Sequence, residues 1–304
     1  RYKPEIYKDS FQLELLSTFS KNEIIKLASN KNPNIAIAFF KCLIKKYPSE
    51  CFQVCLKNID NKKIMYIQTS YDNQIGMTVG TAMLYFAYDK QNVITEKELN
   101  TLIDMAILDF ENRWYLGMYV GRFLAKNVNK PDPRYYSSLK QLIISYPEFS
   151  NFDNLSLLKY FNNYNISEDS IVINKFIKKL LYHDYIYINE ALTYIIQSPQ
   201  LEYFPILEDY YYSKIIGKNF RADEIYFELK LFMEAILQYK SPKAIKIIDG
   251  LVNDVNFHSD GFELVPKEHI YQLLKNTDST SYFIDVTKTL KKKINHQKLA
   301  KIDF

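Results

Sequence analysis

Two five-residue segments of the chain are nearly identical: Gly76-Met77-Thr78-Val79-Gly80 and Gly117-Met118-Tyr119-Val120-Gly121. They share four of five letters, begin 41 residues apart and hold four of the seven glycines in the chain. A glycine inside a helix costs about 1 kcal/mol relative to alanine, so paired glycines in two matching helices indicate that backbones approach closely there. We therefore interpret the two segments as packing points of a repeated structural unit.

The composition favours an all-α chain. Of its 304 residues 47% are hydrophobic, which is ample for a continuous core, while glycine (7) and proline (10) are few. So few turn residues argue against a sheet-rich fold and against long disorder. The net charge of +4 is smaller than that of dedicated nucleic-acid binders. The longest uncharged stretch, residues 73–88, is too short and too polar to span a bilayer, so we expect a soluble chain without a transmembrane segment.

Capping residues mark many of the expected helix starts. Ser20 with Glu23 and Thr95 with Glu98 form capping boxes, in which the acid reaches back to the backbone N–H of the capping residue. A capping side chain also precedes proline, which is favoured at the first helical position, at Asn32-Pro33, Asp132-Pro133, Ser198-Pro199 and Ser241-Pro242. Between these marks, apolar residues recur at spacings of three and four. We predict short helices throughout, among them 49–58 (capped by Ser49), 61–70, 74–88, 110–127, 199–216 and 280–299.

A second repeat lies in the C-terminal half, where a Glu-Ala pair precedes a Ser-Pro pair twice. The copies are Glu190-Ala191 with Ser198-Pro199, and Glu234-Ala235 with Ser241-Pro242, at offsets of 44 and 43 residues. A chain of helix pairs that repeat every 40 to 47 residues or so resembles HEAT and armadillo proteins. The Asp-Pro turn and the arginine typical of HEAT units are absent from most of these repeats. Tetratricopeptide repeats are the nearest rival, but their period of about 34 residues does not fit the offsets.

The resemblance to HEAT proteins implies an architecture and a class of function. It implies one domain over residues 1–304, a right-handed α-α superhelix (α-solenoid) of helical hairpins, with a soft subdivision near residues 127–133. Such a chain would be a non-enzymatic scaffold that binds a protein or peptide on its concave face. The alternative is a HEAT-like nucleic-acid-binding or base-modifying protein, because a family of alkylpurine DNA glycosylases has a similar fold.

Two groups of residues are candidates for partner binding. The only tryptophan and two of the five arginines, Arg113, Trp114 and Arg122, lie within one short segment, and arginine with tryptophan is typical of interface hot spots. The alternative is that Trp114 fills the core while both arginines face solvent. In Tyr210-Tyr211-Tyr212, successive helical positions span about 200 degrees, so the three rings cannot all face one core. We therefore include Tyr210 and Tyr212, although half-buried tyrosines that cover a neighbouring helix would give the same pattern.

No pattern in the chain points to catalysis, a metal or a cofactor, and we predict none of them. The cysteines Cys42, Cys51 and Cys55 lack a fourth ligand for zinc, since the nearest histidine is His183, so we expect buried free thiols. The phosphate-loop, hydrolase and kinase motifs are also missing.

The C-terminal segment reads as a basic amphipathic helix. Its apolar side holds Val286, Leu290 and Ile294, and its basic side holds Lys288, Lys291, Lys292, Lys293, Lys298 and Lys301. Such a helix is typical of a solvated end of a repeat stack, and an acidic partner, a nucleic acid or an anionic membrane surface are the alternatives.

The compartment is the least constrained property. The chain begins at Arg1 without an initiator methionine, so we expect a preceding segment to have been processed or omitted, and a signal peptide is compatible with this. Cysteines without disulfide-like spacing favour a reducing compartment. A cytoplasmic location is therefore favoured over a periplasmic or secreted one.

Overall fold

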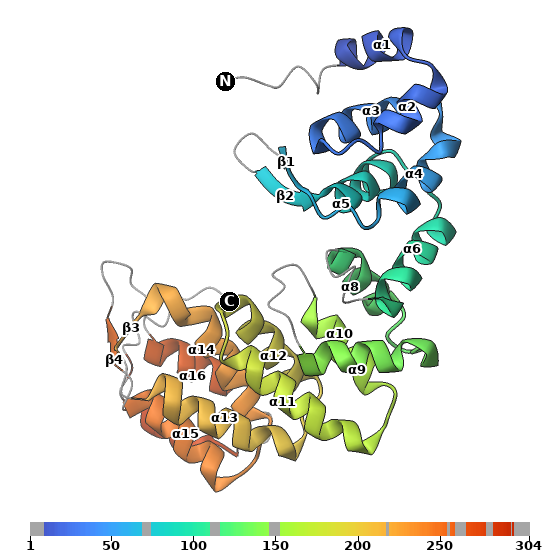
Figure 1. The fold of residues 1–304 in the computed structure, drawn as a ribbon. Coiled ribbons are helices and arrows are strands. Elements are labelled where there is room, and N and C mark those ends of the chain that lie inside the picture. The colour runs from blue at the N-terminus through green and yellow to red at the C-terminus, as the bar shows by residue number, and fades with distance from the viewer. Residues whose placement is uncertain are drawn as a thin grey trace. The chain divides into compact units, whose positions relative to one another are not determined.

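The described part of the chain is mostly helical. The computed structural model describes residues 9–68, 74–109, 116–145, 153–216, 219–253, 256–258, 266–277, 282–292 and 294. Within them lie sixteen α-helices and four short strands, which confirms the predicted all-α class (Figure 1). Contacts group the chain into two compact units, Arg1–Tyr164 and Asn165–Phe304, and each is described by itself. The single domain with a subdivision near residues 127–133 stays a prediction.

The first unit consists of helices in short succession, interrupted once by a β-hairpin. Its elements are α1 (Asp9–Thr18), α2 (Lys21–Leu27), α3 (Pro33–Lys46), α4 (Cys51–Asn58), β1 (Ile64–Gln68), β2 (Gln74–Thr78), α5 (Val79–Leu84), α6 (Glu96–Leu108), α8 (Gly117–Lys126), α9 (Tyr136–Ser145) and α10 (Asn154–Asn162). A π-helical segment, Tyr85–Lys90, continues α5, and single 3-10 turns, Pro48–Glu50 and Pro133–Tyr135, lead into α4 and α9.

Most of the predicted caps are present. The backbone N–H of Ser20 donates to Glu23 Oε2, and that of Thr95 to Glu98 Oε2, both over 2.8 Å, so both capping boxes are confirmed. The side chains of Asn32, Asp132 and Ser241 also accept backbone hydrogen bonds at the starts of α3, the turn Pro133–Tyr135 and α15 (Pro242–Asn253).

Two predicted caps are wrong. Ser49 lies inside the 3-10 turn that leads into α4, and the residue before that helix, Glu50, makes no side-chain capping bond. Ser198 ends a helix instead of starting one, because its N–H donates to the carbonyl of Tyr194 over 2.9 Å. The next helical turn begins only at Leu201.

The helices predicted over 61–70 and 74–88 are wrong in part, since the two strands of an antiparallel β-hairpin replace the middle of the first and the start of the second, while residues 79–88 are helical. In β1 and β2, Ile64 lies opposite Thr78 and Tyr66 opposite Gly76. Met65 is buried (3% exposed), whereas Tyr66 beside it is 68% exposed, which is the alternation of a strand. The sequence hides this alternation because the outward residues of β1 are themselves apolar or aromatic.

The two glycine segments are therefore not structural equivalents, although both make close contacts. Gly76 lies in a strand, while Gly80 and Gly121 lie in helices. A Cβ on Gly80 would lie 3.0 Å from the carbonyl oxygen of Asn58, and one on Gly121 would lie 2.9 Å from the Cβ of Asp153. The predicted close approach is confirmed at these two helical glycines. At Gly76 the nearest atom belongs to the Tyr66 ring, 3.3 Å away.

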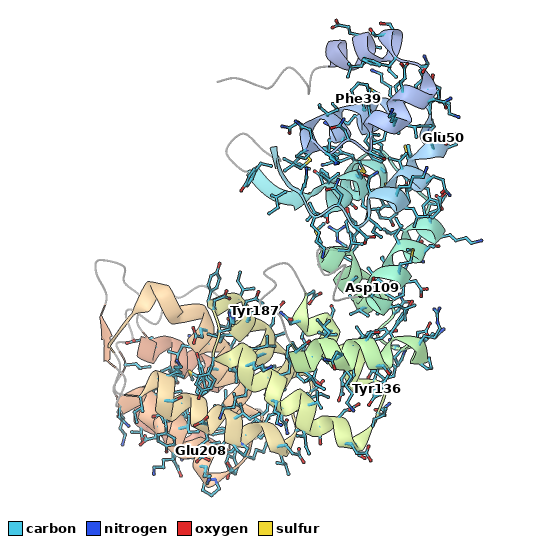
Figure 2. The ribbon with its side chains drawn as sticks, in the orientation of Figure 1. Phe39, Glu50, Asp109, Tyr136, Tyr187 and Glu208 are labelled. Carbon is cyan, nitrogen blue, oxygen red and sulfur yellow. The ribbon has the colours of Figure 1, made fainter. Side chains whose placement is uncertain are left out.

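Helices of the first unit pack on their neighbours in chain order. α3 contacts α1, α2, α4 and α5, and α8 contacts α6 and α10, while α9 contacts α6 and α10. Phe39 of α3, labelled in Figure 2, lies edge-on to Phe19 with ring centroids 5.1 Å apart. The pairs with the most extensive contacts are thus one or two helices apart along the chain.

The second unit repeats this pattern. Its elements are α11 (Ser170–Leu181), α12 (Tyr185–Gln197), α13 (Phe204–Tyr210), a π-helical segment (Tyr211–Ile215), β3 (Asn219–Arg221), α14 (Ala222–Leu237), α15, β4 (Asn256–His258), α16 (Pro266–Thr277) and α17 (Ile284–Lys291), with β3 parallel to β4. α12 packs on α11 and α14, and α14 packs in turn on α15 and α16. Ala191 of α12 and Ala235 of α14 are fully buried, so the second sequence repeat falls on two helices in mutual contact.

Candidate partner-binding surfaces

Arg122 is the one member of the arginine and tryptophan group that the structure places. Arg113 and Trp114 lie outside the described residues. The side chain of Arg122, on α8, is 59% exposed, and its Nη1 lies 3.2 Å from Oδ1 of Asp89 in the π-helical segment Tyr85–Lys90. The guanidinium carbon lies 5.7 Å from the ring centroid of Tyr119, one turn earlier. The exposed guanidinium of Arg122 thus lies over the ring of Tyr119.

Tyr119 forms a hydrogen bond to the same Asp89 carboxylate from the core side. Its hydroxyl donates to Asp89 Oδ2 over 3.1 Å, and its side chain is buried. Burial, and then the negative charge of Asp89, raise the pKa of Tyr119 far above its usual range, so the phenol stays a hydrogen-bond donor. Asp89 therefore ties α8 to the π-helical segment Tyr85–Lys90 and orients Arg122.

Cations flank the aromatic rings of the segment Tyr85–Lys90. Lys41 Nζ, on α3, lies 4.2 Å from the ring centroid of Phe86, and Lys90 Nζ lies 5.2 Å from that of Tyr85. Lys90 follows Tyr85 by five positions, the spacing that a π-helix brings onto one face. This surface combines rings with positive charge, which suits acidic side chains and nucleic-acid bases alike.

The tyrosine tract divides between core and surface. Tyr210 and Tyr211 are buried, with 3% and 2% exposed, whereas Tyr212 is 46% exposed. The prediction that the three rings cannot share one core is confirmed. The Tyr210 hydroxyl donates to Glu228 of α14, and burial followed by this hydrogen bond raises the pKa of Tyr210. Tyr210 thus has the surroundings of a packing residue, and Tyr212 is the ring that a partner can reach.

Ion pairs cross the surface next to Tyr212. Lys178 of α11 lies 2.7 Å from Asp209 of α13, and Lys243 of α15 lies 3.0 Å from Glu208, which Figure 2 labels. The hydrogen bond from Lys178, with that from the Tyr182 hydroxyl, lowers the pKa of Asp209. Lysines on two helices thus enclose the acids of the helix between them.

Sequence reasoning missed Tyr66, the most exposed aromatic among the described residues of the first unit. Ile64 and Tyr66 of β1 are 63% and 68% exposed, and they lay within a predicted helix. The available signal was the β-favouring run Ile64-Met65-Tyr66-Ile67, followed by the turn-forming residues Asp72 and Asn73.

The cysteines and the apolar and basic sides of the C-terminal segment match their predictions where the structure describes them, although α17 (Ile284–Lys291) is shorter than the helix predicted over 280–299. Cys42, Cys51 and Cys55 are buried free thiols, and burial raises the pKa of Cys51 to about 12. On α17 and just after it, Val286, Leu290 and Ile294 are buried while Lys288, Lys291 and Lys292 are exposed; Lys293, Lys298 and Lys301 lie outside the described residues.

The described residues hold neither a cluster of metal ligands nor a membrane-spanning helix. No group of three or more histidine, cysteine, aspartate or glutamate side chains in those ranges could hold a metal ion. None of the helices described is long and apolar enough to cross a membrane.

A polar network fixes the start of the turn Pro133–Tyr135. Arg134 donates from Nη2 to Asp132 Oδ2 over 2.8 Å and to Asp104 Oδ1 over 2.9 Å, and the Tyr135 hydroxyl donates to the same Asp104 oxygen over 2.5 Å. Just after α10, the hydroxyl of Tyr164 donates to the carbonyl of Asp132 over 2.7 Å. The network thus joins α6, the turn Pro133–Tyr135 and the segment just after α10.

The network predicts a dependence of stability on pH. Hydrogen bonds from Arg134, first from its side chain and then from its backbone, hold the pKa of Asp132 below its ordinary 3.8. Because the pKa of Asp132 is lower in the folded than in the unfolded state, its ionised carboxylate stabilises the fold at pH values above the unfolded-state pKa. This stabilisation is lost as the pH falls through the folded-state pKa. We expect Asp132→Asn, which keeps a capping side chain, to lower the urea midpoint at pH 5 but hardly at pH 2. Arg134→Gln should likewise reduce the difference between the urea midpoints at pH 5 and pH 2. If Asp132→Asn lowered the midpoint equally at both pH values, the assignment would be contradicted.

Comparisons of the chain with known protein families, with curated proteins and with solved structures gave no match. Function must therefore be inferred from these surfaces and from the way the helices pack.

Proposed function

We propose that the chain is an α-solenoid of HEAT-like hairpins and a non-enzymatic scaffold that binds a protein or peptide on its concave face. The packing of helices on neighbours one and two places along the chain is the observation that supports this most. In the second unit, α11, α13 and α15 would form one row and α12, α14 and α16 the other. Contacts restricted to neighbouring units are characteristic of repeat proteins.

Side-chain bonds between elements that lie about two helices apart in the chain support the same arrangement. Asp104 and Arg134 are 30 positions apart, and Glu208 and Lys243 are 35 apart. In the first unit, Asn163 donates to the carbonyl of Val128, again 35 positions away. Bonds between helical elements about 30 to 35 positions apart are what a stack of helix pairs would make.

Arg122 and Tyr212 are the residues we assign to partner contact, each within its own unit. Arginine and tyrosine are enriched among the residues that dominate binding energy. Arg122 is oriented by Asp89 yet 59% exposed, and Tyr212 presents its ring beside two buried tyrosines. Binding of nucleic acid is the second candidate, and the lysines placed over Phe86 and Tyr85 favour it.

A retention experiment tests the proposed function. The immobilised full chain should retain a defined set of proteins from a lysate, and Arg122→Ala combined with Tyr212→Ala should weaken their affinity about tenfold or more. Leu201→Ala, at an 82% exposed residue, is the matched control and should retain the same set.

The nucleic-acid alternative is tested in parallel with a labelled mixed-sequence DNA duplex and a single strand. We expect no binding to either at about 50 mM salt. Binding that falls steeply with added salt would instead favour the alternative, because the release of counterions from phosphates gives that dependence.

A further inference from the structure

The outer edge of β1 carries backbone groups that the hairpin does not use. The N–H of Val79 donates to the carbonyl of Lys63 over 2.9 Å, which makes residues 63 and 79 a hydrogen-bonded pair. Antiparallel pairs alternate, so Met65 and Ile67 bond to β2, while the backbone groups of Ile64 and Tyr66 point away from it. Within the described residues, no backbone hydrogen bond from another element reaches either of them.

The side chains along this edge are apolar and exposed. Tyr66 lies across Gly76 of β2, and Ile64 lies next to it on the same face. Natural proteins usually protect such an edge with a charge, a proline or a covering element, because it is a template for another strand. β1 itself, Ile64–Gln68, contains neither a charge nor a proline.

Positive charge gathers where β1 begins. Lys62 and Lys63 precede the strand, and Lys63 Nζ donates to the carbonyl of Lys31 over 2.6 Å, which brings a third lysine to the same end. Asp60 is the only acidic residue between positions 58 and 68. A strand added antiparallel to β1 would have its C-terminal end beside these lysines.

We propose that the outer edge of β1 receives an extended segment of a partner protein as a third, antiparallel strand. In this segment every second residue is apolar and contacts Ile64 or Tyr66. An acidic residue near its C-terminal end lies against Lys31 and Lys62. Main-chain hydrogen bonds supply affinity in this mode, and side chains and charge supply selectivity. The inference rests on the proposed function only in that the partner is a protein.

Three labelled peptides test the inference with the full chain. The first alternates threonine and valine over six residues and ends in two aspartates; the second ends in two lysines. The third keeps the aspartates but carries N-methyl groups on the amides that would face β1. By fluorescence anisotropy, we expect the first peptide to bind at least tenfold more tightly than either of the others. In amide-resolved hydrogen exchange, the first peptide should protect Ile64 and Tyr66, while Met65 and Ile67, already bonded within the hairpin, should change little.

Two variants locate the site. Tyr66→Lys puts a charge on the edge and should weaken the first peptide at least tenfold, whereas Leu201→Lys, the same change at another exposed apolar residue, should not. Lys62→Glu should shift the preference toward the peptide that ends in lysines. Equal binding of the N-methylated peptide, no binding of any peptide, or indifference to Tyr66→Lys would each overturn the inference.

The remaining outcomes separate this inference from the proposed function. Partner retention that is lost with Arg122→Ala and Tyr212→Ala but kept with Tyr66→Lys overturns the edge site and leaves the scaffold function standing. Concentration-dependent dimers of the free chain that Tyr66→Lys abolishes would also overturn it, since the edge would then pair with a second copy.

Discussion

Replacing Gly80 by leucine is expected to lower the free energy of unfolding by about 3 kcal/mol, whereas the same change at Gly76 should cost less than about 1 kcal/mol. A Cβ at Gly80 would lie 3.0 and 3.1 Å from the carbonyl oxygens of Asn58 and Ile59. Both are backbone atoms at the end of α4, so a helix must move to relieve the overlap. At Gly76 the neighbour is the exposed ring of Tyr66, which can rotate away.

The end of α4 has little freedom to yield to Gly80→Leu. The side-chain nitrogen of Asn58 donates to Val54 in its own helix over 2.8 Å and to Ser29 after α2 over 2.9 Å. Urea unfolding followed by circular dichroism measures both variants. Ala125→Leu, at an exposed position of α8, is the matched control and should leave stability nearly unchanged. Equal losses at Gly76 and Gly80 would show that the two glycines share one role after all.

Local chemistry made the helix starts predictable from sequence. A capping box needs only two residues three positions apart, such as Thr95 and Glu98, so neighbouring letters determine it. Ser198-Pro199 shows the limit of this reasoning. A serine before a proline fits a helix start, but here the preceding helix continues to Gln197 and uses the N–H of Ser198 for its last hydrogen bond.

The hairpin and the candidate site depend on contacts that neighbouring letters do not encode. Tyr66 and Ile64 are as apolar as the buried Met65 and Ile67, so no polarity pattern separates the two faces of β1. Arg122 was recognisable as a candidate, but its partner Asp89 is 33 positions away on another element.

Replacing Tyr210 by alanine is expected to destabilise the second unit by about 4 kcal/mol, and replacing Tyr212 by less than about 1 kcal/mol. Tyr210 packs against the rings of Tyr182 and Phe232, at centroid distances of 5.7 and 5.8 Å, and truncation leaves a cavity between α11, α13 and α14. Tyr212 is 46% exposed and loses mainly its edge contact with Tyr211. Chemical unfolding of the two single variants measures the difference.

Tyr210→Phe separates packing from hydrogen bonding in the same ring. It keeps the ring contacts but leaves Glu228 without the phenol donor, so we expect a loss of about 1 to 2 kcal/mol. The order of stability should therefore be wild type and Tyr212→Ala together, then Tyr210→Phe, then Tyr210→Ala. A stable Tyr210→Ala variant with weakened partner retention would reverse the assignment, because Tyr210 would then act at the binding surface and not in the core.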